Sequence, residues 1–457
     1  MSELLIASEE TDSDLDSPSL VLGNFNAEAF WRPADLAQLP SLPSRYEHSV
    51  AGAMDELLFI LCQGKGAVLT ALSMNKTQHR YLHELGFDFM NLSVQEHLSQ
   101  NKSADLDLFH TLAEPSSAAL CEPLLARLPL LPYAILPSTD AFAAQYGAAE
   151  KLPHSSIVAK VNSKIYSHDL AKELGGFAPG EAVYSAQTLL EAGAHYLQGQ
   201  DRIVIKDPYG VSGKGNLVVD SIQMLNRIAQ YVERQQHSGK HVQFLIEPWL
   251  CKANDFSCQL YVDDIGMISI DSIQFMDNRG QNYGGSYEAE PVMTAMLEQN
   301  GYLDTMKEVA RALYKEGYYG PICVDSMLLE DQTLVPIVEI NARHSMGCLN
   351  DRLNRRLKQY GQQAMLLSLE LRIPEWGKEE NAYERLLEQL HASGLLFGTA
   401  SEDGILPLSA NTLLDPRGIH SQGRWYVAIV TSSPLERERW RQKLLAQLAS
   451  IGFVSHI

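Results

Sequence analysis

The pattern of apolar and polar residues in the first third of the chain predicts alternating strands and helices. Three short apolar runs have the length of strands: Leu4–Ala7, Ser19–Gly23 and Ala67–Thr70. Two stretches have helical spacing: residues 55–62 and Thr77–Leu85. The proline-rich stretch Pro115–Pro137 is expected to be a loop. Strands that alternate with helices favour an open α/β sheet, so residues 1–155 are interpreted as one α/β domain.

From Ser155 onward the pattern changes to strands that read as hairpins. The expected strands are Arg202–Lys206, Leu217–Asp220, Val242–Glu247, Phe256–Val262, Met267–Ile273, Gly320–Leu329 and Leu334–Asn341. The expected helices are Ser167–Leu174, Ile222–Gln236 and Leu303–Gly317. Residues 274–286 are rich in Asn, Gly and Asp and are expected to form a loop. This second region ends near residue 373.

Residues 374–457 are interpreted as a small C-terminal α+β domain. Its expected elements are a helix at Glu379–Ser393, strands at Gly404–Leu406 and Trp425–Thr431, and a helix at Leu435–Ile451. Nothing in its pattern of residues indicates a particular chemistry.

The charge balance narrows the classes of partner. The chain has 36 Lys and Arg against 56 Asp and Glu, a formal net charge of −20. Such a charge argues against nucleic acid or an anionic membrane as the main partner, but leaves open a small anionic substrate in a local basic pocket. No apolar run reaches the roughly 18 residues that a membrane span requires.

The N-terminus is acidic and lacks the features of a signal peptide. The six cysteines have no CxxC spacing, and no HExxH motif is present, which argues against a zinc site or a disulfide scaffold. These observations predict a cytoplasmic protein.

Residues 335–347 (VPIVEINARHSMG) form the most informative stretch of the sequence. Its β-branched residues predict a strand, and alternate residues of a strand face one side, so Glu339, Asn341 and Arg343 would form one row. A carboxylate with an amide oxygen is a ligand set that suits Mg²⁺. A guanidinium suits an anion or a developing negative charge. The alternative is the polar face of an edge strand without chemistry.

Asp325 lies in the preceding strand, which a turn near Asp331 and Gln332 joins to the strand of Glu339. Two carboxylates that face each other across a hairpin repel unless a cation lies between them. Asp325 and Glu339 together therefore favour a metal site.

A glycine loop, Gly210–Gly215 (GVSGKG), lies between two predicted strands. It is not a Walker A loop, because Lys214 is followed by Gly215 and no helix follows. A loop of this kind can close over phosphates and offer backbone N–H groups to them, whereas a flexible hairpin tip is the alternative. Lys206 ends the apolar strand before the loop and needs an anionic partner there, which favours phosphate binding.

The segment Glu247–Leu250 (EPWL) ends another predicted strand at a proline. The backbone groups freed there could recognise an adenine ring, with Leu250 as apolar cover. A plain strand exit is the alternative. Asp255 follows and could accept hydrogen bonds from ribose hydroxyls.

The order of these features resembles the ATP-grasp superfamily of carboxylate–amine ligases, which includes biotin carboxylase and D-alanine–D-alanine ligase. The resemblance covers about residues 157–347. It implies an ATP-grasp domain at 156–373, with a lid at about 156–246 and a C-terminal lobe at about 247–373, after the α/β domain 1–155. The sequence Glu-Ile-Asn-Ala-Arg-His-Ser, the Asn-Ser-Lys entry to the domain and the small domain 374–457 are most similar to pheganomycin-type peptide ligases.

The resemblance implies a role for each matching residue. Nucleotide binding is implied for Lys164, Lys206, Gly210, Ser212, Gly213, Lys214, Gly215, Glu247, Leu250 and Asp255. Mg²⁺ binding, with Mn²⁺ as an alternative, is implied for Asp325, Glu339 and Asn341. Catalytic roles are implied for Lys206 and Arg343. Three positions depart from the family pattern: Ser163 is often Asp, Pro248 is often a residue with an N–H group, and Asp255 is usually Glu.

The activity implied is ATP-dependent ligation of a small carboxylate and an amine, such as an amino acid or a peptide, through an acyl phosphate. Ser345 and Gly347 could add hydrogen-bond donors, and the loop 274–286, with Arg279 and Tyr283, could form the acceptor-side wall or could be a solvated surface loop. A homodimer remains open. The alternative functions are a non-catalytic nucleotide-binding regulator and an ATP-grasp kinase or carboxylase.

Overall fold

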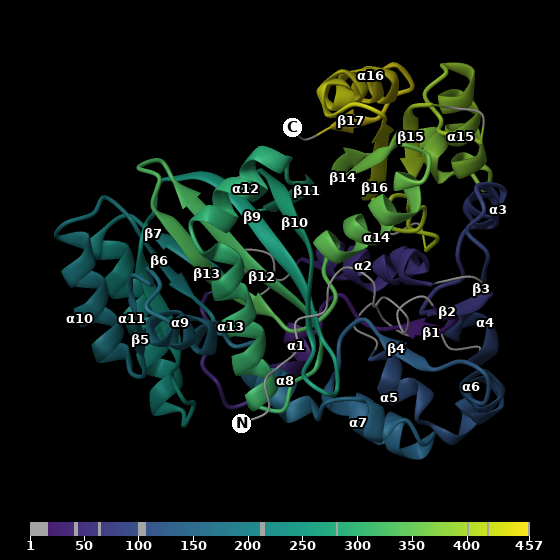
Figure 1. Ribbon diagram of the computed structural model, residues 1–457. Coiled ribbons are helices and arrows are strands. Elements are labelled where there is room, and N and C mark those ends of the chain that lie inside the picture. The colour runs from purple at the N-terminus through teal and green to yellow at the C-terminus, as the bar shows by residue number, and fades with distance from the viewer. Residues whose placement is uncertain are drawn as a thin grey trace.

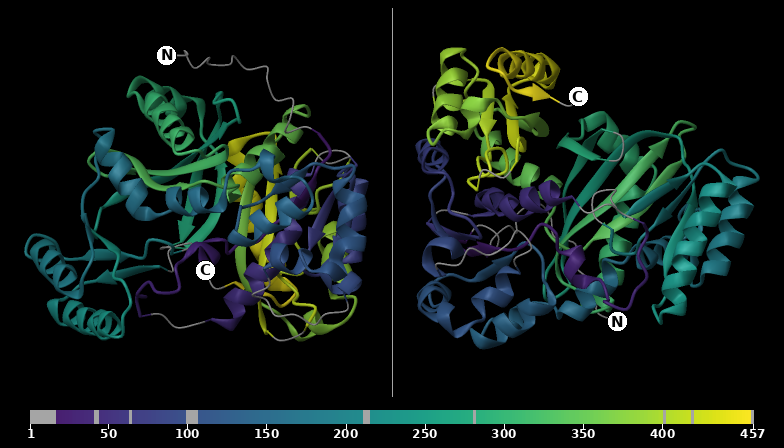
Figure 2. Two further views of the ribbon diagram at one scale, coloured as in Figure 1. Left: turned by 90° about the horizontal axis from the view of Figure 1, so that it is seen from below. Right: turned by 180° about the vertical axis from the view of Figure 1, so that it is seen from behind.

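A computed structural model describes residues 17–40, 44–62, 65–98, 107–210, 215–279, 282–399, 402–417 and 420–455. These residues form a mixed α/β structure, as predicted (Figure 1). An N-terminal sheet and a small four-stranded lid sheet lie on opposite sides of a large antiparallel sheet (Figures 1 and 2). No helix in this described part of the chain combines the length and the apolar character needed to cross a membrane.

The N-terminal sheet is parallel, in the order β3-β2-β1-β4. Its strands are β1 (Leu20–Leu22), β2 (Gly66–Thr70), β3 (Phe89–Ser93) and β4 (Leu130–Pro132). Its helices are α1 (Glu28–Trp31), α2 (Arg45–Ala53), α3 (Lys76–Glu84), α4 (Val94–Leu98), α5 (Leu108–Leu112), α6 (Ala118–Leu125) and α7 (Pro137–Gln145). Strands β1 and β2 are buried along their whole length, as expected of parallel strands covered on both faces. The predicted strand Leu4–Ala7 lies outside the described residues.

The prediction of a loop over Pro115–Pro137 is wrong. This stretch contains the 3₁₀ helix η2 (Pro115–Ser117), α6 and β4. Pro115 and Pro137 stand in the first turns of their helices, where the missing N–H would have no partner in any case. Pro132 ends β4, which is an edge strand. The number of prolines was therefore misleading, because these three occupy positions that regular structure tolerates and Pro123 lies inside α6 without ending it.

Two carboxylates are buried in the 3₁₀ helix η1 (Met54–Leu61), at the place where the sequence predicts a helix. Asp55 accepts from the backbone N of Ala71 at 2.5 Å. Glu56 accepts from three successive backbone N–H groups, of Ala410, Asn411 and Thr412, at 3.0–3.1 Å. Glu56 thus fastens the C-terminal part of the chain to the N-terminal sheet.

The lid is an antiparallel sheet in the order β5-β8-β6-β7. Its strands are β5 (Glu181–Val183), β6 (Ile203–Lys206), β7 (Asn216–Val219) and β8 (Phe244–Pro248), and its helices are α10 (Ala186–Leu197) and α11 (Ile222–His237). Helices α8 (Ser155–Val161) and α9 (Lys164–Glu173) lead into it, after η3 (Ala149–Lys151). The predicted strands and helices of this region are confirmed, with ends that differ by a few residues.

A strap from the N-terminal part of the chain (residues 32–39) crosses to the lid. Ala37 N donates to His241 O at 2.7 Å, and His241 N donates to Asp35 O at 2.8 Å. Ala37 and Leu39 are buried in the hydrophobic core of the lid itself. The lid is therefore completed by residues that precede it in the chain by more than a hundred positions.

The large sheet is antiparallel, in the order β13-β12-β9-β10-β11-β14-β16-β15, with β17 beside β14. The strands in the middle of the chain are β9 (Lys252–Val262), β10 (Ile268–Arg279), β11 (Asn282–Glu288), β12 (Gly320–Leu329) and β13 (Leu334–Asn341). The helices that accompany them are α12 (Pro291–Gln299), α13 (Tyr302–Lys315) and α14 (Met346–Lys358). The turn between β12 and β13 contains Gln332 with φ 69°, at the predicted position.

The prediction of a loop at residues 274–286 is wrong, because the described residues of this stretch, 274–279 and 282–286, belong to β10 and β11. Phe275 and Tyr287 stack across the two strands with ring centroids 5.7 Å apart. Gln274 is fully buried and accepts from Asn350 Nδ2 at 2.9 Å, so a polar residue here faces a polar partner. A Cβ at Gly285 would lie 2.3 Å from Leu366 O, so glycine permits the close approach of β14.

The C-terminal elements extend the large sheet. They are β14 (Gln363–Arg372), β15 (Gly404–Pro407), β16 (Gln422–Thr431), β17 (Val454–Ser455), α15 (Ala382–Ala392) and α16 (Arg437–Ser450), with η4 (Glu375–Lys378) and η5 (Pro434–Glu436). Strand β14 pairs with β11 on one side and with β16 on the other. The predicted boundary at residue 373 falls directly after this shared strand. The division into domains stays a prediction.

We expect the free energy of unfolding to fall as the pH rises from about 5 to about 8. Burial raises the pKa of Asp55 to about 8 and that of Glu56 to about 7, against about 4 in an unfolded chain. The folded state then binds more protons than the unfolded state across this range, so these groups stabilise at low pH and lose that contribution as the pH rises. Each contributes up to about 1.4 kcal/mol per pH unit.

Asp55→Asn should flatten this slope in urea unfolding measured between pH 5 and 9, because an amide cannot ionise. Asp304→Asn is the control, since the Asp304 side chain is 84% exposed. A slope that is equal in wild type and Asp55→Asn would contradict the assignment.

Candidate active site

The predicted row of polar side chains lies on the β12–β13 ladder. Asp325 is directly opposite Glu339, and Cys323 is opposite Asn341. Asn341 Nδ2 donates to Asp325 Oδ2 at 3.2 Å, and Arg343 Nη2 donates to Asn341 Oδ1 at 3.0 Å. The structure therefore brings together the two acids and the amide, as the alternation of the strand predicts, and Arg343, two residues beyond the end of β13, joins them.

The Asp325 carboxylate is in an unfavourable electrostatic environment. Burial and the neighbouring charge of Glu339 raise its pKa to about 7, against the attraction of Arg343. Among the described side chains it forms no ion pair. Its partners are the Asn341 amide and the Cys323 thiol, whose Sγ lies 3.6 Å away.

Two carboxylates and an amide fit a hard cation such as Mg²⁺, whose other ligands are usually water and phosphate oxygens. The oxygen of Asn341 now faces Arg343, so it would have to turn to ligate. No cluster of three or more His, Cys, Asp or Glu suited to a metal occurs in the described part of the chain.

Lys164 joins the lid side of the site to this ladder. It begins α9, directly after the N-cap Ser163, and it is almost fully buried. Its Nζ donates to Glu339 Oε1 at 2.5 Å and to Gly210 O at 2.7 Å. The lysine therefore bridges the acidic strand and the neck of the glycine loop.

The outer edge of β13 is closed by two side chains from the helices before the lid. Ile340 N donates to Ser167 Oγ at 3.0 Å, and Ala342 N donates to Asn162 Oδ1 at 2.9 Å. Strand β13 is the edge of the large sheet, so these bonds satisfy N–H groups that would otherwise be exposed. They hold the row of acids in position beneath Lys164.

A second buried ion pair lies on the lid. Lys206 Nζ is 2.5 Å from Glu247 Oε2, and both side chains are mostly buried. Gly180, at φ +106°, leaves room for this arrangement, since a Cβ there would lie 2.7 Å from Glu247 Cγ.

His168 of α9 is a residue that the sequence reasoning missed. Its Nε2 is buried without a hydrogen-bond partner among the described residues. Its pKa is lowered by burial and then by Lys172.

The neck of the glycine loop is closed. Asp207 N donates to Gly215 O at 2.7 Å, and a Cβ on Gly210 would lie 2.3 Å from Gly215 Cα. Only glycine permits this approach at both positions. Arg32 of the strap forms an ion pair with Asp207, just before the neck. The predicted phosphate-binding residues Ser212, Gly213 and Lys214 lie outside the described residues, and their roles stay predictions.

The remaining predicted nucleotide residues lie near the ladder or at the end of β8. Asp255 lies on β9 beside β12, forms an ion pair with Lys252 and accepts from Asn278 Nδ2 at 2.7 Å. Leu250 follows β8 and is half-buried. Pro248 has no N–H, but Trp249 N donates to Arg202 O at 3.0 Å.

Arg343 has a partner that the sequence did not suggest. Its Nε and Nη2 donate to Glu28 Oε1 of α1 at 2.9 and 2.5 Å, and its guanidinium lies 5.9 Å from the centre of the Tyr133 ring. Burial lowers the pKa of Arg343, but the charge of Glu28, the neighbouring Tyr133 and the hydrogen bond to Glu28 together raise it above its usual value. The N-terminal sheet thus orients this arginine from 315 residues away in the sequence.

Gln259 connects the acidic ladder to the start of α14. Ser345, the N-cap of α14, donates to Gln259 Oε1 at 2.7 Å. Gln259 Nε2 donates to Ser257 Oγ at 2.9 Å and to Cys323 Sγ at 3.4 Å. The Ser345 hydroxyl is thus used within the protein, and the donor roles predicted for Ser345 and Gly347 stay predictions.

Tyr283, predicted for the acceptor wall, lies on β11. Its hydroxyl is 2.8 Å from Ser286 Oγ, and either oxygen could be the donor.

No protein-family model matches the chain. Among curated proteins, it is 27% identical over 207 residues to a [butirosin acyl-carrier protein]–L-glutamate ligase of Niallia circulans, a match that covers 42% of this chain and 47% of that protein. The chain thus spans about half the length of this relative.

The solved structures include N5-carboxyaminoimidazole ribonucleotide synthetase in its ADP complex, with TM-score 0.52 and 11% identity, over 97% of this chain and 98% of that chain. They also include the biotin carboxylase domain of Hydrogenobacter thermophilus 2-oxoglutarate carboxylase, solved with MgADP, ADP and bicarbonate, with TM-score 0.52 and 12% identity, over 96% and 90% of the two chains. The chain has the ATP-grasp fold.

The resemblance to the ATP-grasp superfamily is therefore confirmed for the fold. These two solved enzymes catalyse different reactions, so a shared fold does not determine the reaction of this chain. The finer resemblance to pheganomycin-type peptide ligases stays a prediction.

Gly347→Ala should lower the free energy of unfolding by about 1–3 kcal/mol, the usual cost of overpacking. A Cβ at this position would lie 2.6 Å from Gln259 Nε2, which is buried and held by the network described above. Urea unfolding measures the change. Gly199→Ala is the matched control, because a Cβ there meets nothing within 4 Å. The double variant with Gln259→Ala should recover part of the loss, and a Gly347→Ala protein as stable as wild type would contradict the model of a tight contact.

Proposed function

We propose that this chain is an ATP-dependent carboxylate–amine ligase that forms an amide through an acyl phosphate. The observation that supports this most is the junction at Lys164, where one buried lysine meets both the acidic ladder and the neck of the glycine loop. Such a junction would place the phosphates of ATP between the glycine loop and the proposed metal-binding strand. The similarity to a ligase from Niallia circulans gives independent support.

The proposed reaction has two steps. A carboxylate oxygen of the first substrate attacks the γ-phosphorus of ATP, the bond to the bridging oxygen breaks, and ADP leaves an acyl phosphate behind. The nitrogen of the second substrate then attacks the acyl carbon, the C–O bond to phosphate breaks, and the amine loses a proton to give the amide. Both steps build negative charge that must be neutralised.

Different residues of this chain have different roles in these two steps. Lys164 and Lys206 hold phosphate oxygens after they give up their present partners, Glu339 and Glu247. Asp325, Glu339 and Asn341 would bind Mg²⁺, which neutralises phosphate charge when it is bound. Arg343 would face the substrate carboxylate or the tetrahedral oxyanion with the one Nη1 N–H that Glu28, Asn341 and the His344 carbonyl leave without a partner among the described residues.

A screen of carboxylate and amine pairs for ATP-dependent phosphate release, with mass spectrometry of the products, tests the proposal. An amide product with ADP and phosphate supports it. A carboxylated or phosphorylated product would instead assign a carboxylase or a kinase, and nucleotide binding without turnover would assign a regulator.

Glu339→Gln should abolish turnover and leave the fold intact, because it removes a charge that the proposed metal site requires. Glu330→Gln is the control, since Glu330 is an exposed acid at the turn of the same hairpin. Turnover is measured as ADP release at saturating Mg²⁺, and the fold by circular dichroism. Wild-type turnover in Glu339→Gln would remove Glu339 from the metal site.

Arg343→Lys should retain nucleotide binding but lose roughly 10²-fold or more in kcat, as the removal of an oxyanion donor typically does. Lysine keeps the charge but cannot bond Glu28 and the substrate at once with a planar fork. The nucleotide affinity measured by calorimetry should therefore be retained, while the rate of product formation should fall. If both fall together, Arg343 serves the nucleotide or the fold instead.

A further inference from the structure

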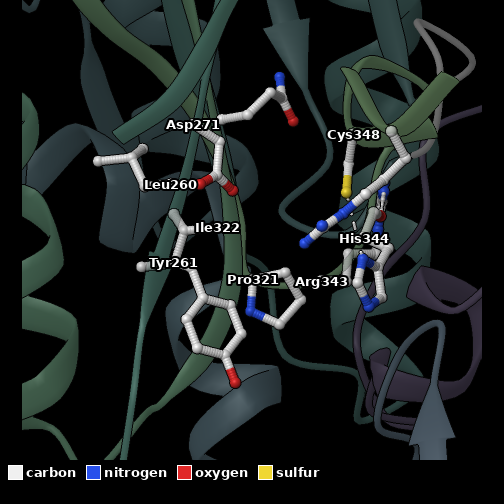
Figure 3. Close-up of a pocket in the computed structure, with 10 residues that line it drawn as sticks. Leu260, Tyr261, Asp271, Pro321, Ile322, Arg343, His344 and Cys348 are labelled. Carbon is white, nitrogen blue, oxygen red and sulfur yellow. Dashed lines mark hydrogen bonds between the residues drawn. The ribbon is translucent and has the colours of Figure 1, made fainter. Parts of the chain in front are cut away.

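The short helix α1 lies between two separate parts of the proposed site and contacts both. Its first residue, Glu28, orients Arg343, which lies beside a small pocket with room for about one water molecule (Figure 3). Directly after α1, Arg32 begins the strap and forms an ion pair with Asp207 of the lid. The side of the site with Arg343 and the side with the glycine loop are thus both supported from one turn of helix.

Arg32 is itself held in place, so it can serve as a support for other residues. The residue before it, Trp31, is buried and donates from Nε1 to Ile135 O at 2.8 Å, which anchors α1 on the N-terminal part of the chain. The Nη2 group of Arg32 donates to Ala37 O within the strap. The Nη1 group donates to Asp207 Oδ1. One guanidinium therefore connects α1, the strap and the lid.

Asp207 contacts both ends of the glycine loop. Its backbone N–H donates to Gly215 O at 2.7 Å, and its carbonyl accepts from Gly210 N at 3.2 Å. Its side-chain Oδ1 accepts from Tyr209 N at 3.0 Å as well as from Arg32. A shift of Asp207 would therefore move both ends of the loop at once.

The ion pair between Arg32 and Asp207 is largely shielded from solvent. The two side chains are 14% and 10% exposed, respectively. A shielded pair keeps more of its attraction than a surface pair does, and removal of one partner leaves the other charge uncompensated. An uncompensated carboxylate at the neck of the glycine loop would also repel the phosphates of a nucleotide. Arg32 neutralises this carboxylate while it fixes the position of Asp207.

We propose that Arg32 is a positioning residue for nucleotide binding, because it fixes the neck of the glycine loop through Asp207. This inference rests on the proposed function, which assigns phosphate binding to that loop. Lys164 holds the same neck from α9, since its N donates to Pro208 O at 3.0 Å and its Nζ to Gly210 O at 2.7 Å. When the side chain of Lys164 turns to phosphate, Arg32 still holds the neck from the opposite end of the chain's lid segment.

Calorimetry with ADP and Mg²⁺ tests this role, because it requires no knowledge of the carboxylate or the amine. The double variant Arg32→Gln/Asp207→Asn removes the ion pair but keeps the net charge of the chain. It should bind ADP about 10-fold or more weakly than wild type, the equivalent of one charge-assisted hydrogen bond. Arg32→Lys should lose less affinity than Arg32→Gln, because lysine keeps the charge that pairs with Asp207.

The single variant Asp207→Asn separates positioning from the effect of charge alone. If only the electrostatic potential mattered, the loss of a negative charge near the loop would strengthen the binding of phosphates. We expect weaker binding instead, because Arg32 loses the carboxylate through which it holds the neck. Tighter binding of ADP by Asp207→Asn, or wild-type affinity in the double variant, would overturn the role of Arg32.

Gln235→Ala is the matched control for the strap. Gln235 of α11 bonds the other end of the strap twice, since its Oε1 accepts from Gln38 N at 3.0 Å and its Nε2 donates to Gln38 O at 2.8 Å. This variant should leave the affinity for ADP unchanged. A loss equal to that of the double variant would overturn the inference, because the strap as a whole would then determine the affinity.

Two results distinguish a failure of this inference from a failure of the proposed function. If wild type binds no ADP, the proposed function fails and this inference with it. If wild type binds ADP and the double variant binds it equally well, this inference alone fails. Circular dichroism shows whether each variant is folded. If the double variant does not fold, Asp207→Asn decides the question, since asparagine keeps the shape of the side chain and the acceptor for Tyr209 N.

Discussion

Two like charges on one face of a buried hairpin constrain the whole site. Asp325 and Glu339 are direct cross-strand neighbours. At a separation of about 5 Å and an effective dielectric constant of about 20, their repulsion amounts to about 3 kcal/mol. One cation at similar range offsets it. The structure places Lys164 against Glu339 and gives Asp325 only neutral donors. One further positive charge beside Asp325 would balance the charges of the site.

The elements that meet this constraint come from all parts of the chain. Helix α9 supplies Lys164 and also closes the edge of β13 through Ser167. The N-terminal sheet supplies Glu28, which orients Arg343. Helix α9 therefore fixes the edge of β13, and Glu28 fixes Arg343 in the segment that follows β13. The N-terminal part of the chain thus belongs to the site and is not a separate module.

The sequence was sufficient where the deciding contacts are local. The alternation of Glu339, Asn341 and Arg343, and the turn at Gln332, follow from neighbouring residues, so the row and its register were predictable. The hairpin β10–β11 was not, because its buried Gln274 is compatible with a strand only through its distant partner Asn350. Polar residues of that kind read as a loop when the partner is unknown.

The site residues that the sequence did not predict were missed for the same reason. Glu28 and Gln259 belong to no local motif, and each matters through a side chain that is far away in the sequence. A single sequence contains no signal for such contacts, apart from a buried position occupied by a charged residue.

The strap of residues 32–39 has a consequence for how this chain can be recombined with its relatives. Because Ala37 and Leu39 fill the lid core and the backbone of the strap pairs with His241, the lid is assembled from two separate stretches of sequence. A chimaera that exchanges only residues 181–248 with a relative would leave a foreign strap in the transplanted core. The smallest exchangeable unit includes the strap, and sequence changes in the two stretches must be matched to each other.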